Sequence, residues 1–489
     1  MAEKRVDLSA ALEKKSDLDI LLILCPVWGV DVPPLGVSYL KSYLNQKGHS
    51  CDVLDINIDL FLQGSPEERE LWKMQNYKFW TDGKLFEEKM LKLFHEQIES
   101  YVDEILKRDV KNIGFSINCG NVLFSLELAR RIKEKDKEKV LIFGGPDSQY
   151  LKNSQIEKGK DVFLGVIDVL VVGEGEYVLS EVLSRIKNSE DLNGLSGIVT
   201  YRGNEHSFSG GGIFIENLDE LPFPDFGWAN LDHYSGKKMP ILMSRGCVRQ
   251  CKFCNDKLFF AKYRRRSAEN VFQEISKRVI ENKSQTFWFM DLMLNADLAE
   301  LDRLSSMIIK SGLGIHWMGQ FGIRKDMTRD FLSKMKKSGC VALIYGVESF
   351  ADNTLKLMNK PYAFKDIKNN LKDTERAGIS AFSNIIVGFP GEGEKEFGET
   401  TKGIRECRRY LKGITSLAPC LLTLNSEVQV NFDKYGIIHE GEMGYLNWFD
   451  GNNNYESRKS KIKQVLTLSS ELDLPVMFVN LHDELIENR

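Results

Sequence analysis

Short apolar runs and longer amphipathic stretches follow one another from the start of the chain. Residues 19–24 (D-I-L-L-I-L) form an apolar run, residues 33–45 have helical periodicity, and residues 51–56 (C-D-V-L-D-I) alternate like a strand. Gly48 lies between the second and third of these segments, where a glycine commonly ends a helix. The pattern predicts a strand–helix–strand unit of the kind that builds parallel sheets.

The same alternation continues further along the chain. We therefore predict an α/β fold that begins with an open, doubly wound parallel sheet of Rossmann-like type at residues 1–217. Its further strands are predicted at residues 112–117, 140–143 and 169–172, and a further helix at residues 123–134.

Residues 61–109 interrupt the alternation with a stretch rich in charge and in aromatic residues at helix-compatible spacings. We interpret this stretch as a helical insertion. Packing of the aromatic side chains onto the sheet is favoured over a lid for a substrate. These residues are Trp72, Phe79, Trp80, Phe86 and Phe94.

A segment that begins L-D-E-L-P-F-P-D-F at residue 218 carries two prolines, which favour extended backbone. We place a linker at residues 218–236, a second domain at 237–440 and a small C-terminal extension at 441–489. Renewed strand–helix alternation predicts a partial (β/α) barrel with its ligands at the carboxyl ends of the strands. The predicted strands are residues 240–243, 287–290, 315–319, 341–345 and 383–387.

Composition narrows the classes of function. The 489 residues exceed one hydrophobic core, and 42% hydrophobic residues are typical of a folded protein. A net charge of -4 provides no basic field for nucleic acid or anionic lipid. Neither a signal-like apolar segment nor a membrane-spanning run is present, so we expect a cytoplasmic location. Nine cysteines are then expected as buried thiols, metal ligands or catalytic groups before disulfides.

Three cysteines lie together after the first predicted strand of the second domain. Cys247, Cys251 and Cys254 have the spacing C-x3-C-x2-C within S-R-G-C-V-R-Q-C-K-F-C-N-D. Three thiolates on one loop can hold a four-iron cluster and leave one iron open to another ligand. The sequence therefore predicts a reactive [4Fe-4S] cluster.

Three alternatives to this cluster are less consistent with the sequence. A structural zinc site needs a fourth ligand, and the nearest candidates, His233 and Cys340, are isolated. An electron-transfer ferredoxin also needs a fourth cysteine, and none is suitably placed. Three unrelated thiols at this spacing would be a coincidence.

The cysteine loop resembles the signature of the radical S-adenosylmethionine (SAM) superfamily, with Phe253 at the usual aromatic position. The resemblance implies that SAM binds the open iron and is cleaved to a 5′-deoxyadenosyl radical. It also implies an external electron donor of flavodoxin or ferredoxin type.

Further segments resemble SAM-binding positions of the same superfamily. Glu348 in Y-G-V-E-S would bind SAM, although it could also cap a helix, and Gly388 in N-I-I-V-G-F-P-G-E would allow adenine to approach. Asp291 and the segment 263–266 (Y-R-R-R) fit positions on the SAM side of the barrel, with a solvated basic turn as the alternative for the arginines. The segment Met358-Asn359-Lys360 is familiar in this group and receives no chemical role.

The order P-P-L-G, S-I-N-C-G-N, G-G-P-D and V-V-G-E-G-E before such a barrel resembles the cobalamin-binding domain of cobalamin-dependent radical SAM enzymes. A D-x-H-x-x-G motif is absent, so cobalamin would be bound without a protein imidazole. A domain that keeps the fold and holds no cofactor is the alternative. The residues implied near cobalamin are Ser116, Asn118, Cys119, Asn121, Gly144, Gly145, Gly173, Glu174, Gly175 and Glu176.

The leading hypothesis is a cobalamin-dependent methyltransferase that acts on an unactivated carbon or phosphorus of a small-molecule or lipid-like substrate. The alternatives are radical cyclisation, coupling or rearrangement without methyl transfer, and a non-catalytic iron–sulfur redox sensor or binding protein. In the C-terminal extension, residues 448–455 favour a surface turn over a substrate-facing loop, and residues 457–472 favour a helix.

Overall fold

The computed structural model describes residues 18–152, 163–202, 205–439 and 447–479. The chain forms two compact units. One comprises Met1–Ile215 and Leu221–Ser235, and the other comprises Glu216–Glu220 and Gly236–Arg489. Each unit contains a seven-stranded sheet.

The first unit is built on a sheet with the strand order β2-β1-β3-β4-β5-β6-β7. Its first five strands are parallel, in the order of flavodoxin-like folds, and β6 and β7 pair antiparallel at one edge. The predicted parallel sheet is confirmed. The strands are β1 (Ile20–Leu24), β2 (Cys51–Asp55), β3 (Asn112–Ser116), β4 (Val140–Gly144), β5 (Val169–Val171), β6 (Ile198–Arg202) and β7 (Glu205–Ser209).

Alternate residues of the strands point to opposite faces, and both faces are covered. Leu21 and Ile23 belong to one apolar cluster, while Ile20 and Leu22 belong to a second cluster. The first cluster includes residues of α7 (His95–Lys107) and α8 (Val122–Lys135), and the second includes residues of α1 (Leu35–Gln46) and α10 (Gly175–Lys187). This two-sided burial explains why the strands read as continuous apolar runs.

The insertion between β2 and β3 packs aromatic residues inward, as expected, but the ring they meet belongs to the helix α8 and not to a strand of the sheet. Trp80 is fully buried, stacks on Phe94 at 5.7 Å between ring centroids, and meets Phe124 of α8 at 6.4 Å. Trp72 contacts Trp80 edge-on at 5.2 Å. The helices of this region are α2 (Ile56–Gln63), α3 (Pro66–Arg69), α4 (Lys78–Thr81), α5 (Gly83–Leu85) and α6 (Leu91–Leu93).

The second unit is built on a parallel sheet with the order β18-β15-β14-β13-β12-β11-β8. The sheet is an open, all-parallel half-barrel, which confirms the predicted partial barrel. Its strands are β8 (Met239–Ile241), β11 (Thr286–Phe289), β12 (His316–Phe321), β13 (Cys340–Glu348), β14 (Ser380–Val387), β15 (Leu411–Pro419) and β18 (Val476–Val479).

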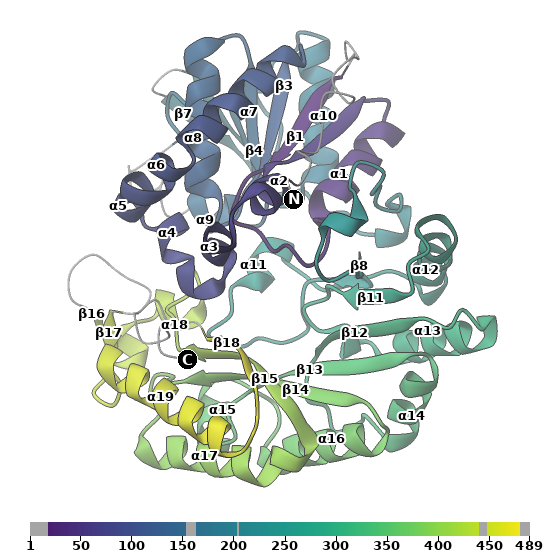
Figure 1. Cartoon of the computed structure of the whole chain (residues 1–489), viewed down its shortest axis with the longest axis vertical. Coiled ribbons are helices and arrows are strands. Elements are labelled where there is room, and N and C mark those ends of the chain that lie inside the picture. The colour runs from purple at the N-terminus through teal and green to yellow at the C-terminus, as the bar shows by residue number, and fades with distance from the viewer. Residues whose placement is uncertain (1–17, 153–162, 203–204, 440–446, 480–489) are drawn as a thin grey trace, which may run out of the picture. The chain divides into compact units, whose positions relative to one another are not determined.

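Helices lie along one side of this sheet (Figure 1). Because every strand is parallel, the segments that follow the strands meet at one edge, where barrel enzymes hold their ligands. The helices are α12 (Ala268–Asn282), α13 (Leu298–Ser311), α14 (Arg329–Lys337), α15 (Asp352–Leu357), α16 (Phe364–Arg376) and α17 (Glu394–Cys407). Among the described residues, no helix is both long and apolar enough to cross a membrane.

The C-terminal extension packs into the second unit. Its helix α19 (Tyr455–Glu471) matches the predicted helix. The expectation of a surface turn just before it is wrong for two residues, because Trp448 and Asn453 are each 2% exposed. Trp448 lies under the guanidinium of Arg458, 3.9 Å from its ring centroid. Residues 448–455, although rich in turn-forming Asn and Gly, therefore form a connection whose side chains are partly buried.

A buried carboxylate ends β2 in the first unit. Asp55 caps α2 by accepting from the backbone N–H of Ile58 at 3.0 Å, and it accepts from the Tyr234 hydroxyl at 2.8 Å. Burial raises the pKa of Asp55 from its usual 3.8 to about 7. Between these two pH values, the folded chain holds a proton that the unfolded chain has released.

We expect Asp55→Asn to change the pH dependence of stability. Wild-type protein should lose stability relative to Asp55→Asn as the pH rises from about 4 to about 7, by up to about 1.4 kcal/mol per pH unit, and the difference should be constant above about pH 8. Asparagine can keep both hydrogen bonds, because its oxygen still accepts and its amide can donate to the tyrosine. Urea unfolding of both proteins at several pH values measures this difference. Parallel stability curves would contradict the assignment.

Candidate functional site

The three cysteines lie on a loop between two short strands. β9 (Ser244–Arg245) and β10 (Arg264–Arg265) pair antiparallel at the two ends of this loop. Gly246 starts the loop with φ +81°, and a Cβ at this position would lie 2.4 Å from the carbonyl oxygen of Lys262. Only glycine fits such a close approach.

Segments that follow three other strands hold the loop through its polar groups. The guanidinium of Arg249 donates to a carbonyl oxygen in the segment after β12. The backbone of Lys252 forms hydrogen bonds with the segments after β13 and β15. Gln250 accepts one hydrogen bond from the segment after β13, and Asn255 donates one to the segment after β15. The distances are Arg249 Nη2 to Ile323 O 3.1 Å, Lys252 N to Met358 O 3.2 Å, Asn359 Nδ2 to Gln250 O 2.8 Å, Val428 N to Lys252 O 3.2 Å and Asn255 Nδ2 to Leu424 O 3.2 Å. The loop is thus fixed at the carboxyl edge of the sheet.

The thiols of Cys247, Cys251 and Cys254 are all half-buried. Burial raises the pKa of Cys251 and raises that of Cys254 to about 12, and each thiol is influenced by the charge of its neighbour in the loop. Half-buried thiols that interact along one loop fit the donor set of a cluster. The described side chains show no group of three or more His, Cys, Asp or Glu arranged around a single ion. The cluster ligands remain a prediction.

Glu348 ends β13 with φ +65°, and its carboxylate is nearly buried. Its Oε1 forms an ion pair with Lys360 Nζ at 3.0 Å, and the same ammonium lies 5.3 Å from the ring centroid of Phe253. Burial alone would lower the pKa of Lys360, but the attraction of Glu348 outweighs it, so the net shift is upward. The structure therefore brings Glu348 and Phe253 together through a lysine.

Asp291, which follows β11, is 1% exposed. One carboxylate oxygen accepts from the Met243 N–H at 3.0 Å and the other accepts from the Ser244 hydroxyl at 2.5 Å. Burial raises the pKa of Asp291 to about 6. Both oxygens are engaged with the strand that leads into the cysteine loop, so the visible role of Asp291 is to position that loop. Its predicted contact with SAM is untested.

The arginines of segment 263–266 divide into two groups. Arg264 and Arg266 are buried, and Arg266 Nη1 forms an ion pair with Glu274 at 2.5 Å and donates to Leu242 O at 2.8 Å. Arg265 is partly exposed and pairs with Asp297 at 2.8 Å. The alternative of a solvated basic turn is therefore wrong for Arg264 and Arg266.

Gly388 follows β14 with φ +70°. A Cβ there would lie 2.4 Å from Cγ of Arg458, and the Gly388 N–H donates to Glu392 Oε1 at 2.8 Å. The glycine is thus required by packing of the C-terminal extension. Adenine contact at Gly388 remains a prediction, but the close approach seen in the structure is made by Arg458.

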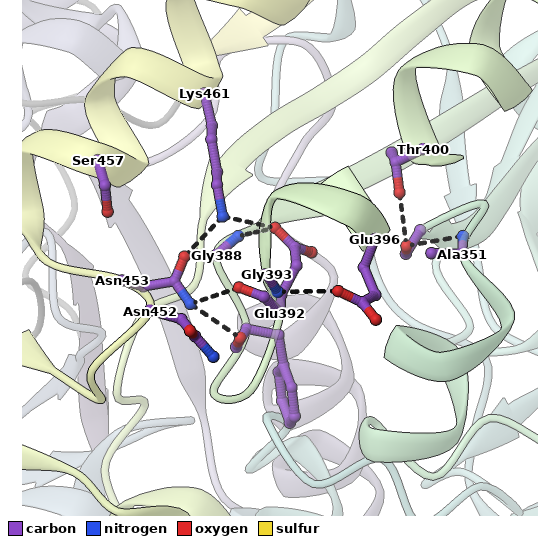
Figure 2. A network of polar contacts seen from close by, with 12 residues as sticks. Ala351, Gly388, Glu392, Gly393, Glu396, Thr400, Asn452, Asn453, Ser457 and Lys461 are labelled. Carbon is purple, nitrogen blue, oxygen red and sulfur yellow. Dashed lines mark hydrogen bonds and ion pairs between the residues drawn. The ribbon is translucent and has the colours of Figure 1, made fainter. Parts of the chain in front are cut away.

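A buried polar network joins the loop after β14 to α19 (Figure 2). Lys461 Nζ lies 3.3 Å from Glu392 Oε1 and 2.7 Å from Asn453 Oδ1, and Asn453 Nδ2 donates to Glu392 O at 2.9 Å. The side chains of Lys461 and Glu392 are 2% and 1% exposed. Sequence reasoning missed this pair, because its members are 69 residues apart.

In the first unit, the segments after β3 and β4 meet at the carboxyl edge of the sheet. Asn118 Oδ1 accepts from the Gly120 N–H at 2.7 Å, and the Cys119 N–H donates to Asp147 Oδ2 at 2.6 Å. Gly145 has φ +129°, and a Cβ there would lie 2.5 Å from Ile117 O. The sequence prediction named most of this edge, including Ser116 and Gly144, and missed Asp147.

Asn121 fixes the same turn from within. Its Oδ1 accepts from the Asn118 N–H at 2.7 Å, and its Nδ2 donates to Ser116 O at 2.9 Å. Asn121 is fully buried, so its amide serves the turn. An edge preformed in this way can offer backbone groups to a ligand at the topological switch point.

The predicted cobalamin-binding residues after β5 are engaged within the protein. Glu174 and Glu176 are 3% and 4% exposed, and Glu174 Oε2 accepts from the Ile215 N–H at 3.1 Å. A Cβ on Gly175 would lie 3.2 Å from Leu40 of α1, and one on Gly173 would lie 3.4 Å from Gly212. This segment therefore shows packing and internal hydrogen bonds. Its cobalamin contacts remain a prediction.

Comparison with known proteins agrees with this architecture. The model of the radical SAM superfamily matches residues 241–403. An uncharacterised methyltransferase of Pyrococcus horikoshii, PH0819, is 24% identical over 397 residues, which cover 79% of this chain and 77% of that protein. An anaerobic magnesium-protoporphyrin IX monomethyl ester cyclase of Cereibacter sphaeroides is 25% identical over 293 residues, which cover 56% of this chain and 47% of the cyclase.

The structure of the radical SAM methyltransferase TsrM from Kitasatospora setae, solved with cobalamin and a [4Fe-4S] cluster, is similar over 88% of this chain and 78% of TsrM, with a TM-score of 0.62 at 14% identity. The parallel sheet followed by a half-barrel with a cysteine loop defines an α/β protein of the radical SAM type. Residues 241–403 match the radical SAM superfamily, and the chain as a whole is similar to B12-binding radical SAM methyltransferases. It is a radical SAM enzyme.

Proposed function

We propose that the chain is a cobalamin-dependent radical SAM methyltransferase that acts on an unactivated carbon or phosphorus. The observation that carries this proposal is the joint similarity of both units to TsrM, at a TM-score of 0.62 over 88% of the chain. The preformed edge after β3 and β4 supports it from the first unit. An electron donor of flavodoxin or ferredoxin type would supply the reducing equivalents.

In the second unit, Cys247, Cys251 and Cys254 would bind the cluster, which would supply the electron that cleaves SAM. Phe253 within the loop and Glu348 at the end of β13 would contact SAM. Asp291 holds the start of the loop through Met243 and Ser244. The chain's own contribution is to fix the loop and to keep water away from the radical.

In the first unit, Ser116, Asn118 and Cys119 would lie beside cobalamin, with the backbone of Gly144 and Gly145 open to close approach. Cobalamin would supply the methyl carrier. A fixed edge lowers the ordering cost of binding, because its turns are already bonded in the protein.

The proposal predicts products as well as occupancy. Protein purified anaerobically with cobalamin, reconstituted with iron and sulfide, and given SAM and dithionite should form 5′-deoxyadenosine and S-adenosylhomocysteine and retain one cobalamin per chain. Gly145→Ala should lower cobalamin occupancy by roughly tenfold, because strain of about 1–3 kcal/mol would distort the edge. Gly83→Ala is the matched control, since a Cβ there meets nothing within 4 Å.

The cyclase similarity favours a second candidate, radical cyclisation without methyl transfer. That candidate predicts 5′-deoxyadenosine without S-adenosylhomocysteine in the same assay. Normal cobalamin occupancy in Gly145→Ala would remove the support that the first unit gives to the leading proposal.

A further inference from the structure

The segment Met358-Asn359-Lys360 lies against the cysteine loop, with two of its residues hydrogen-bonded to the loop and the third beside a ring of the loop. Met358 O accepts from the Lys252 N–H at 3.2 Å, and Asn359 Nδ2 donates to Gln250 O at 2.8 Å. The ammonium of Lys360 lies near the ring of Phe253, which stands between Cys251 and Cys254 in the loop. The segment follows α15 directly and gives the loop one hydrogen bond from a backbone group, one from a side-chain amide, and one positive charge nearby.

The charge of Lys360 is held in a confined position. Its side chain is 8% exposed, its Nζ lies 3.0 Å from Glu348 Oε1 and 5.3 Å from the ring centroid of Phe253, and it donates to Gly346 O at 3.4 Å. A buried cation is screened little by water or salt, so its field acts at nearly full strength on adjacent groups.

One-electron reduction of a cluster adds one negative charge and changes no bond in the protein. The reduction potential of such a cluster depends on its surrounding charge, on hydrogen bonds to its sulfurs and on solvent exposure. A cation fixed beside a ligating sulfur stabilises the reduced state more than the oxidised state. An anion at the same distance has the opposite effect.

We propose that Lys360 is a positioning residue whose charge, held beside the cysteine loop, raises the reduction potential of the cluster, and that Glu348 offsets part of this charge. The inference rests on the assignment of the cluster to Cys247, Cys251 and Cys254. It does not depend on methyl transfer. Because Glu348 is also a predicted SAM ligand, the same ion pair links SAM binding to the electrostatics of the cluster.

The test is a reductive titration of reconstituted full-length protein without SAM, followed by electron paramagnetic resonance. Lys360→Met should make the midpoint potential more negative by about 59 mV. For a one-electron couple, this shift is a tenfold lower ratio of reduced to oxidised cluster at a given potential. Glu348→Gln should make the midpoint potential more positive, because the cation is then no longer offset. Lys360→Arg should stay near the wild type, since it keeps the charge.

Lys252→Met is the matched control. Lys252 lies in the cysteine loop itself, but its ammonium sits over the ring of Tyr435 at 5.7 Å. The midpoint potential of the Lys252→Met protein should differ from that of the wild type by less than a third of the shift in Lys360→Met. Iron and sulfide analysis of each variant reports on cluster assembly separately from its potential.

An unchanged midpoint in Lys360→Met would overturn the proposal, and so would shifts of the same sign in Lys360→Met and Glu348→Gln. If Lys360→Met fails to hold iron, the Glu348→Gln variant tests the proposal, and a midpoint potential that is not more positive than that of the wild type overturns it. Failure of the cluster assignment would look different, because iron would then remain bound in Cys251→Ala.

Discussion

Replacement of Cys251 by alanine should remove the cluster and abolish SAM cleavage. Two thiolates on a loop cannot hold a four-iron cluster that already has one open iron, so the variant should contain little iron after reconstitution. No 5′-deoxyadenosine should form under dithionite. Iron and sulfide analysis, the visible absorption of the cluster and a product assay measure the three consequences.

Cys340→Ala is the matched control for this variant. Cys340 is fully buried at the start of β13, and its thiol faces the carbonyl oxygen of Ala342 at 3.9 Å. It was also a candidate fourth ligand in the zinc alternative. Cys340→Ala should therefore keep full iron content and activity, and a parallel loss in both variants would contradict the three-cysteine assignment.

Much of the fold could be predicted because its signals are local. Strands buried on both faces read as apolar runs, and β1, β2, β3, β4 and β5 lie within a few residues of their predicted positions. The antiparallel strand β7 was missed because four of its five residues are exposed and give no apolar pattern. β15 was missed because Lys412, Thr415 and Ser416 interrupt its apolar residues.

The candidate site could be predicted only where its chemistry lies in one short segment. The cysteine loop has a recognisable spacing, whereas its anchors come from segments up to 176 positions away, as with Lys252 and Val428. The role of Lys360 depends on a contact with Glu348 across twelve positions. Residue type alone gave Lys252, Val428 and Lys360 no chemical role, because nothing in the sequence shows that the fold brings these residues to the site.

Removal of Arg266 should have the largest effect on the stability of the second unit. Arg266 and Glu274 form an ion pair with side chains 3% and 0% exposed. In Arg266→Met, the buried carboxylate of Glu274 would keep Arg278 as an ion-pair partner. The Nη2 of Arg278 lies 3.9 Å from Glu274 Oε1. Breaking a buried pair from one side typically costs about 3–5 kcal/mol. Urea unfolding of the apo-protein, followed by circular dichroism, measures the loss.

Two further variants test whether the loss of stability comes from the buried ion pair. The double variant Arg266→Met/Glu274→Leu should recover part of the stability, because the carboxylate of Glu274 is then no longer buried without Arg266, although Arg278 also loses its contact with Glu274. Arg265→Met lies one residue away on the exposed side and should cost only about 0–1 kcal/mol. Equal losses in Arg265→Met and Arg266→Met would show that the buried pair is not the source of the effect.

The effect of Arg266 should also reach the cluster. Its backbone N–H donates to Met243 O at 2.8 Å, and the Met243 N–H donates in turn to Asp291, so the entry to the cysteine loop is bonded from two sides. If Arg266→Met loosens this entry, its cluster should be lost faster in air than that of the wild type at equal initial iron content. The double variant should then regain stability but not the full lifetime of the cluster, because leucine and methionine cannot replace the bond from Arg266 Nη1 to Leu242 O.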